Sequence, residues 1–112
     1  MAEDITWYGE SGRAYTFKCY PDGQQFNPVS AVYILCSKQS PGVMQALYVG
    51  EAQSLQQRLN TGVSSHKGYA RARDLGMTHI GVRVAASEQE RLSVENDLRR
   101  GMRPPANLQG VG

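Results

Sequence analysis

The pattern of apolar and polar positions predicts four strands in the first half of the chain. They are residues 5–9, 13–20, 31–36 and 46–50. The first two are short, β-prone and aromatic, and Ser11-Gly12 lies between them, which is typical of a β-hairpin. The third is a continuous apolar run, as in a strand that is covered on both faces. Pro21-Asp22-Gly23 predicts a turn after the hairpin.

The second half of the chain predicts three helices and one more strand. Ser54 and Ser87 each begin a capping box, so helices are expected after both. The first is expected to end at Gly62 and the last at Arg100 or Gly101, before Pro104-Pro105 forbids further helix. Residues 67–75 predict a short helix that stops at Gly76, and residues 78–84 alternate as in a half-buried strand.

This order, β-β-β-β-α-α-β-α, predicts an α/β (α+β) fold in one domain that spans residues 1–112. We expect a small, mostly antiparallel central sheet of three strands with helices around it. The N-terminal β-hairpin, residues 1–28, is predicted to extend this sheet, and residues 30–109 form the core. A chain of 112 residues has room for one core and one site.

Composition excludes a membrane protein and leaves nucleic-acid binding open. The longest purely apolar run, residues 31–36, is too short to cross a bilayer, and the acidic N-terminus has no secretion signal. We therefore expect a cytoplasmic protein in which Cys19 and Cys36 are reduced, with Cys36 in the core. A net charge of +2 permits nucleic-acid binding without arguing for it.

An unusual glutamate lies on the last predicted helix. At 100° per residue, the apolar residues Leu92, Val94, Leu98 and Met102 cover one face, and Glu95 falls near its middle. A carboxylate aimed at a core is costly unless something compensates it. Two interpretations stay open: Glu95 forms a structural pair with Arg91 one turn earlier, or it is a metal ligand or an acid–base group.

Residues 30–109 resemble the GIY-YIG nucleases. The tripeptides Ala31-Val32-Tyr33 and Tyr48-Val49-Gly50 are similar to the two that name the family. Arg58, Glu95 and Asn107 follow in the order and spacing of the family's helix arginine, its glutamate and its C-terminal asparagine. Each residue alone also fits a structural role, as a packing tyrosine, a surface arginine or a turn asparagine. Their joint order favours the family.

The resemblance implies a metal-dependent endonuclease that acts on nucleic acid, DNA in the first instance, with little sequence specificity. Glu95 would hold one Mg²⁺ or Mn²⁺ ion, completed by waters and phosphate oxygens. Arg58 would bind the scissile phosphate. Tyr33 or Tyr48 would position or deprotonate the attacking water, and Asn107 would fix the C-terminal loop against the site.

Three positions depart from the family pattern. Gly62 stands where many members carry His or Tyr, and His66 fills that role if residues 61–65 form a local insertion. Otherwise His66 is a surface or capping residue. Ala31 replaces a glycine of the first tripeptide. Glu51 would either weaken phosphate binding or add a second metal contact, and the sequence does not choose between these.

The basic residues Lys67, Arg71 and Arg73 are expected on one short helix, either as contacts to the nucleic-acid backbone or as a solvated face. The chain has almost nothing beyond the nuclease-like core, so we expect low specificity or recruitment by a protein partner. The alternative function is a module that binds nucleic acid or a protein and has weak or no catalysis. The sequence leaves the oligomeric state open.

Overall fold

A computed structural model describes residues 2–108, without the side chain of Leu108. Its centre is a five-stranded antiparallel sheet in the order β1-β2-β5-β3-β4. The strands are β1 (Glu3–Tyr8), β2 (Ala14–Pro21), β3 (Ala31–Ser40), β4 (Val43–Ala52) and β5 (His79–Val84). The α+β class is confirmed. The expected three-stranded sheet was too small, because β2 pairs with β5 and makes the N-terminal hairpin a continuous part of the sheet.

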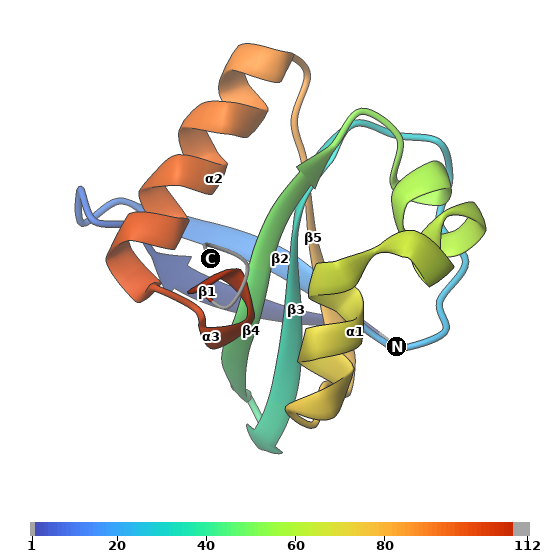
Figure 1. The fold of residues 1–112 in the computed structure, drawn as a ribbon. Helices are drawn as coiled ribbons and strands as arrows, with labels where there is room; N and C mark the ends of the chain where they lie inside the picture. Colours follow the sequence, from blue (N-terminus) through green and yellow to red (C-terminus); the bar gives the residue numbers. More distant parts are fainter. Residues whose placement is uncertain (1, 109–112) are drawn as a thin grey trace.

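Helices cover both faces of this sheet (Figure 1). One face carries α2 (Glu88–Met102). The other carries the π-helix η1 (Gln56–Thr61), the 3₁₀ turn η2 (Val63–Ser65) and α1 (Lys67–Asp74). The short helix α3 (Pro105–Leu108) lies beside the edge strand β4. No helix within residues 2–108 is long and apolar enough to cross a membrane.

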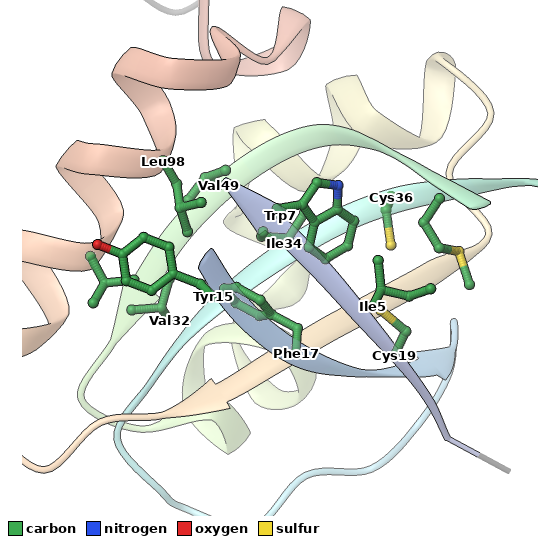
Figure 2. Packing of buried hydrophobic residues seen from close by; sticks show 12 residues of the cluster. Ile5, Trp7, Tyr15, Phe17, Cys19, Val32, Ile34, Cys36, Val49 and Leu98 are labelled. Atoms are coloured by element: carbon green, nitrogen blue, oxygen red, sulfur yellow. The ribbon is translucent and has the colours of Figure 1, made fainter. Parts of the chain in front are cut away.

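The core on the α2 face joins the hairpin to the rest of the sheet. Figure 2 shows the side chains of Trp7, Phe17, Ile34, Val49 and Leu98 meeting there. The Trp7 and Phe17 rings meet edge to face at 5.5 Å. Because α2 supplies Leu98 to this cluster, the helix is held against the strands that carry the candidate site.

Cys19 and Cys36 are buried in the same cluster and are free thiols, as expected. Cys19 lies on β2 and Cys36 on β3, and β5 runs between these two strands. The strands set their backbones about 10 Å apart, which is beyond the Cα separation that a disulfide spans. The two side chains still reach each other across β5, and this contact, with burial, raises the pKa of the Cys36 thiol.

The tip of the hairpin is fastened to α2 by Asp97. The carboxylate of Asp97 accepts hydrogen bonds from the backbone N–H of Ser11 at 2.9 Å, from the Ser11 hydroxyl at 2.6 Å and from the Tyr15 hydroxyl at 2.8 Å. These donors lower the pKa of Asp97 below its ordinary value. Gly9 and Gly101 have no side chain at the points where the hairpin and the helix come closest.

Three sequence expectations need correction. Leu92 was placed on the apolar face of α2, but its side chain is exposed, and Arg91 is buried instead. The helix after Pro104 was excluded, yet α3 begins at Pro105. Proline is tolerated in the first turn of a helix, where its missing N–H has no intrahelical partner to lose. The strands β3 and β4 also extend beyond the predicted residues 31–36 and 46–50.

Candidate functional site

Tyr33, Tyr48, Arg58 and His66 form one cluster on the α1 face of the sheet. The hydroxyl of Tyr33 lies 2.6 Å from Nε2 of His66 and 3.4 Å from Nε of Arg58, which donates to it. The rings of Tyr33 and Tyr48 stack at 6.1 Å, and the His66 ring meets that of Tyr48 edge-on at 5.2 Å. The structure therefore brings together four of the six residues predicted for catalysis.

Two glycines make the room for this cluster. Gly50 is paired with Tyr33 across β3 and β4, and a side chain on Gly50 would overlap the rings of Tyr33 and Tyr48. Gly68 in α1 lies against the other side of the Tyr48 ring in the same way. The glycine of the second tripeptide thus has a packing role: it lets two aromatic rings lie flat against the sheet.

His66 carries its proton toward Tyr33. Its Nδ1 accepts a hydrogen bond from the backbone N–H of Tyr69 at 3.1 Å and so caps the start of α1. In the neutral ring the proton is therefore on Nε2, which donates to the Tyr33 hydroxyl. Burial, together with Arg58 and Arg71, lowers the pKa of His66 to about 4. His66 is a neutral donor at neutral pH, so it does not act as a base toward Tyr33.

The two tyrosines differ in their access to solvent. Tyr33 is 0% exposed, and burial raises the pKa of its hydroxyl far above the ordinary value, with a further rise from Tyr48. The donors Arg58 and His66 favour a phenolate, but burial outweighs them. The side chain of Tyr48 is half-buried, so its hydroxyl is the better placed of the two to contact a water molecule.

Arg58 reaches the cluster because η1 is a π-helix. Gly62 ends η1 by donating its N–H to the carbonyl of Gln57 at 2.7 Å, and a side chain at Gly62 would overlap that oxygen. The 3₁₀ turn η2 then brings His66 back to Tyr33. His66 is therefore a buried cluster residue rather than a surface one.

The exposed side chain of Arg58 lines an open groove of about 350 Å³. Glu51 and Arg91 line the same groove, together with residues from the end of β4, η1 and the start of α2. Nε of Arg91 donates to Glu51 at 2.7 Å, and Nη1 of Arg91 donates to the Ser30 hydroxyl at 2.7 Å. Arg91 thus neutralises Glu51 beside the candidate phosphate site. Sequence reasoning missed this pair, because its partners lie 40 positions apart.

Glu95 lies on α2, on the opposite face of the sheet from Tyr33. Arg91, its expected structural partner, pairs with Glu51 instead. The side chain of Glu95 is half-buried, and burial raises its pKa, with a smaller rise from Glu51 and an opposing effect from Arg99. No described residue bonds to this carboxylate, and no buried side-chain polar atom lacks a partner. The oxygens of Glu95 are therefore not completely buried, although burial still raises the pKa of this carboxyl.

Asn107 fixes α3 to the edge of the sheet. Its side-chain oxygen accepts from the backbone N–H of Val49 at 2.7 Å, and its Nδ2 donates to the Val49 carbonyl at 2.9 Å. These two bonds imitate a neighbouring strand at the centre of Tyr48-Val49-Gly50. Asn107 is 7% exposed and sits at the strand edge between the two faces, so its role is to position β4.

The structure thus places the predicted residues on two sides of the edge strand. Tyr33, Tyr48, Arg58 and His66 occupy the α1 face, while Glu95 occupies the α2 face near Glu51. Within residues 2–108, no hydrogen bond or ion pair joins Glu95 to Arg58. A substrate that contacted both Glu95 and Arg58 would have to cross the edge of β4.

The basic residues predicted on α1 have different surroundings: Lys67 and Arg73 are exposed, and Arg71 is half-buried. Nε of Arg71 donates to the carbonyl of Ala106 at 2.9 Å, which ties α1 to α3. The guanidinium of Arg73 lies over the Tyr69 ring at 5.9 Å. Two of the three side chains therefore contact the protein itself.

Comparison of the chain with protein-family models, with curated protein sequences and with solved structures gave no significant match. The functional conclusion therefore depends on the residues and their geometry.

Proposed function

We propose that this protein is a GIY-YIG-type endonuclease that hydrolyses phosphodiester bonds in nucleic acid, with DNA as the first substrate to test. The observation that carries the proposal is the cluster in which Tyr33, Tyr48, His66 and Arg58 meet beside an exposed groove. A purely structural cluster would have little use for an exposed guanidinium held against two stacked phenols.

Each side chain has a role that follows from its position. Arg58 presents its free guanidinium nitrogens to the groove, where they pair with a phosphate. Tyr48, with its half-buried ring, orients the attacking water. Tyr33 and His66 lie behind it. The Tyr33 hydroxyl accepts a hydrogen bond from Arg58, and the rings of Tyr33 and His66 pack against the ring of Tyr48. Of the two tyrosines, Tyr48 is thus the one that contacts the water.

The carboxylates at the β4 edge fit a divalent cation of the Mg²⁺ or Mn²⁺ type. No group of three or more His, Cys, Asp or Glu side chains within residues 2–108 is arranged to hold a metal. Mg²⁺ sites need few protein ligands, because waters and substrate phosphates complete the shell. Glu95 would be the group that holds the ion, because no described residue bonds to its carboxylate. Glu51 raises the pKa of Glu95 but is itself paired with Arg91. Such an ion would neutralise charge on the phosphate and leaving oxygens.

The alternative is a module that binds nucleic acid or a protein partner with weak or no catalysis. The raised pKa of Tyr33 favours this alternative, because a buried neutral phenol does not take a proton from water. The ion pair between Arg91 and Glu51 favours the nuclease instead, because it removes the repulsion between the Glu51 carboxylate and an incoming phosphate. A nicking assay distinguishes the nuclease from the binding module.

The test is a plasmid-nicking assay with Mg²⁺ or Mn²⁺ that compares the wild type with Glu95→Gln. Glutamine keeps the shape and removes the charge, so we expect at least a hundredfold slower nicking. Glu90→Gln is the matched control on the same helix. Glu90 caps the backbone N–H of Ala86, and glutamine can accept that bond equally well.

Three outcomes are decisive. Loss of nicking in Glu95→Gln but not in Glu90→Gln supports the proposal. Nicking that Glu95→Gln leaves unchanged would reject Glu95 as part of the site. A wild type that binds DNA or RNA but cuts neither would favour the binding module.

A further inference from the structure

Three arginines form an open groove at the C-terminal end of α2, away from the cluster around Tyr33. Arg99, Arg100 and Arg103 line this groove of about 490 Å³, and Glu10 is the one acidic residue among its described lining residues. All three arginine side chains are exposed, and none forms an ion pair with a residue in the described range 2–108. We call these three residues the arginine patch.

The arginine patch continues from the candidate site. Arg99 lies one helical turn after Glu95 and lowers the pKa of that carboxyl, so the two charges lie within electrostatic reach. Asn107, which clamps the edge strand at Val49, also lines the groove of the patch. A ligand bound at the β4 edge therefore meets the patch without crossing the core.

Helix stability alone does not account for the patch. Cations in the last turn of a helix interact favourably with its dipole, which explains Arg99 and Arg100. Arg103 lies beyond the helix and has a left-handed backbone with φ 49°, where glycine would be less strained. A non-glycine residue there is strained, because its Cβ comes too close to the following carbonyl oxygen. Three like charges in one groove also repel one another.

We propose that the arginine patch binds the phosphodiester backbone of the nucleic acid on one side of the cleavage point. This inference rests on the proposed function and adds the direction of the bound strand: it runs along α2, from Glu95 toward Arg103. The exposed guanidiniums fit phosphate oxygens, which they can bind in pairs of hydrogen bonds. This surface takes the role that the sequence had suggested for Lys67, Arg71 and Arg73.

The distance from Glu95 to Arg103 sets the length of nucleic acid that the surface can contact. Eight residues separate Glu95 from Arg103, which is about 12 Å along a helix axis. At about 3.4 Å per base step, this corresponds to three or four base pairs. The patch contacts phosphates without reading bases, so its binding is insensitive to sequence and steeply dependent on salt.

The test measures binding of a labelled DNA duplex of about 20 base pairs in EDTA, across about 50 to 200 mM salt. Arg103→Gly removes one charge and relieves the left-handed backbone, so we expect a melting temperature equal to or above that of the wild type. We also expect about eightfold weaker binding at about 0.1 M salt and a log–log salt slope smaller by about one.

A triple variant, Arg99→Gln with Arg100→Gln and Arg103→Gly, should weaken binding more than a hundredfold and reduce the slope by about three. Lys18→Gln on β2 is the matched control, because it removes the same charge from an exposed side chain outside this groove. We expect it to bind DNA as the wild type does. Equal losses in Lys18→Gln and Arg103→Gly would indicate a general charge effect and overturn the proposal.

A cleavage assay distinguishes the binding role of the arginine patch from the proposed nuclease activity. A wild type that cuts DNA, together with a folded triple variant that binds with the wild-type affinity and slope, rejects the arginine patch and leaves the nuclease. A wild type that never cuts, together with a triple variant that loses binding, rejects the nuclease and supports the patch as a backbone-binding surface.

Discussion

Acidification is the perturbation that most directly probes the cluster around His66. The side chain of His66 is 1% exposed and lies near the guanidiniums of Arg58 and Arg71. A second proton would place a buried charge there, and it would also occupy Nδ1, which now accepts from the N–H of Tyr69. Both effects oppose protonation in the folded state.

The pKa of His66 gives the free energy of unfolding that is lost on acidification. It falls from 6.5 to about 4 on folding, so the unfolded chain binds more protons throughout that interval. Stability is therefore fully present above pH 6.5 and is lost as the pH falls toward 4. At 1.36 kcal/mol per pKa unit, the loss from this residue is about 3 kcal/mol.

Urea unfolding at pH 7 and at about pH 4, on the wild type and on His66→Asn, measures this loss. Asparagine keeps an acceptor at the helix N-cap and has no titration in this range. Asp97 and Glu3, whose pKa values are lowered, contribute acid losses that both proteins share. We expect the wild type to lose about 3 kcal/mol more than the variant. Equal losses in the two proteins would refute the reasoning.

Three further perturbations test the edge strand and the site. Asn107→Ala leaves the buried N–H and carbonyl of Val49 without partners and should cost about 2 kcal/mol in urea unfolding, whereas a loss below about 0.5 kcal/mol would dismiss the clamp. Gly50→Ala puts a methyl group into the ring of Tyr33, so we expect a loss of about 1–3 kcal/mol and slower nicking; a variant as stable and active as the wild type would contradict the packing. Because the pKa of Glu95 is raised, nicking should fall at a higher pH than an ordinary glutamate would give, and a rate that falls only where an ordinary glutamate is protonated would contradict this reasoning.

Local patterns were enough to predict most elements of the fold. The glycine at 76 ends α1 with a positive φ of 93°, and the Ser87 hydroxyl caps α2 by accepting from Glu90 at 3.1 Å, as their positions in the sequence predict. The extension of β3 over residues 37–40 was not predicted, because these residues are polar and their strand pairing comes from residues 43–45 of β4. The position of Leu92 was wrong because Arg91, paired with Glu51, takes the buried place.

The candidate site was predicted in part. The resemblance implied that Tyr33, Tyr48, Arg58 and Glu95 would share one site. The first three meet, while Glu95 lies on the other face of the sheet. The π-helix that carries Arg58 and the 3₁₀ turn that precedes His66 have no local sequence signature, although Gly62 marks the point between them. The Arg91–Glu51 pair and the groove at the end of α2 depend on contacts between distant segments, which periodicity does not reveal.

The measurement that tests the central claim most directly is a double-mutant cycle on single-turnover DNA cleavage. The four proteins are the wild type, Arg58→Ala, Glu95→Gln and the double variant, assayed with Mg²⁺. If both side chains act on the same phosphate across the edge of β4, each single change abolishes most of the rate, and the double variant is little slower than the worse single one. Losses that simply multiply, or a single variant that cuts at the wild-type rate, would contradict the account.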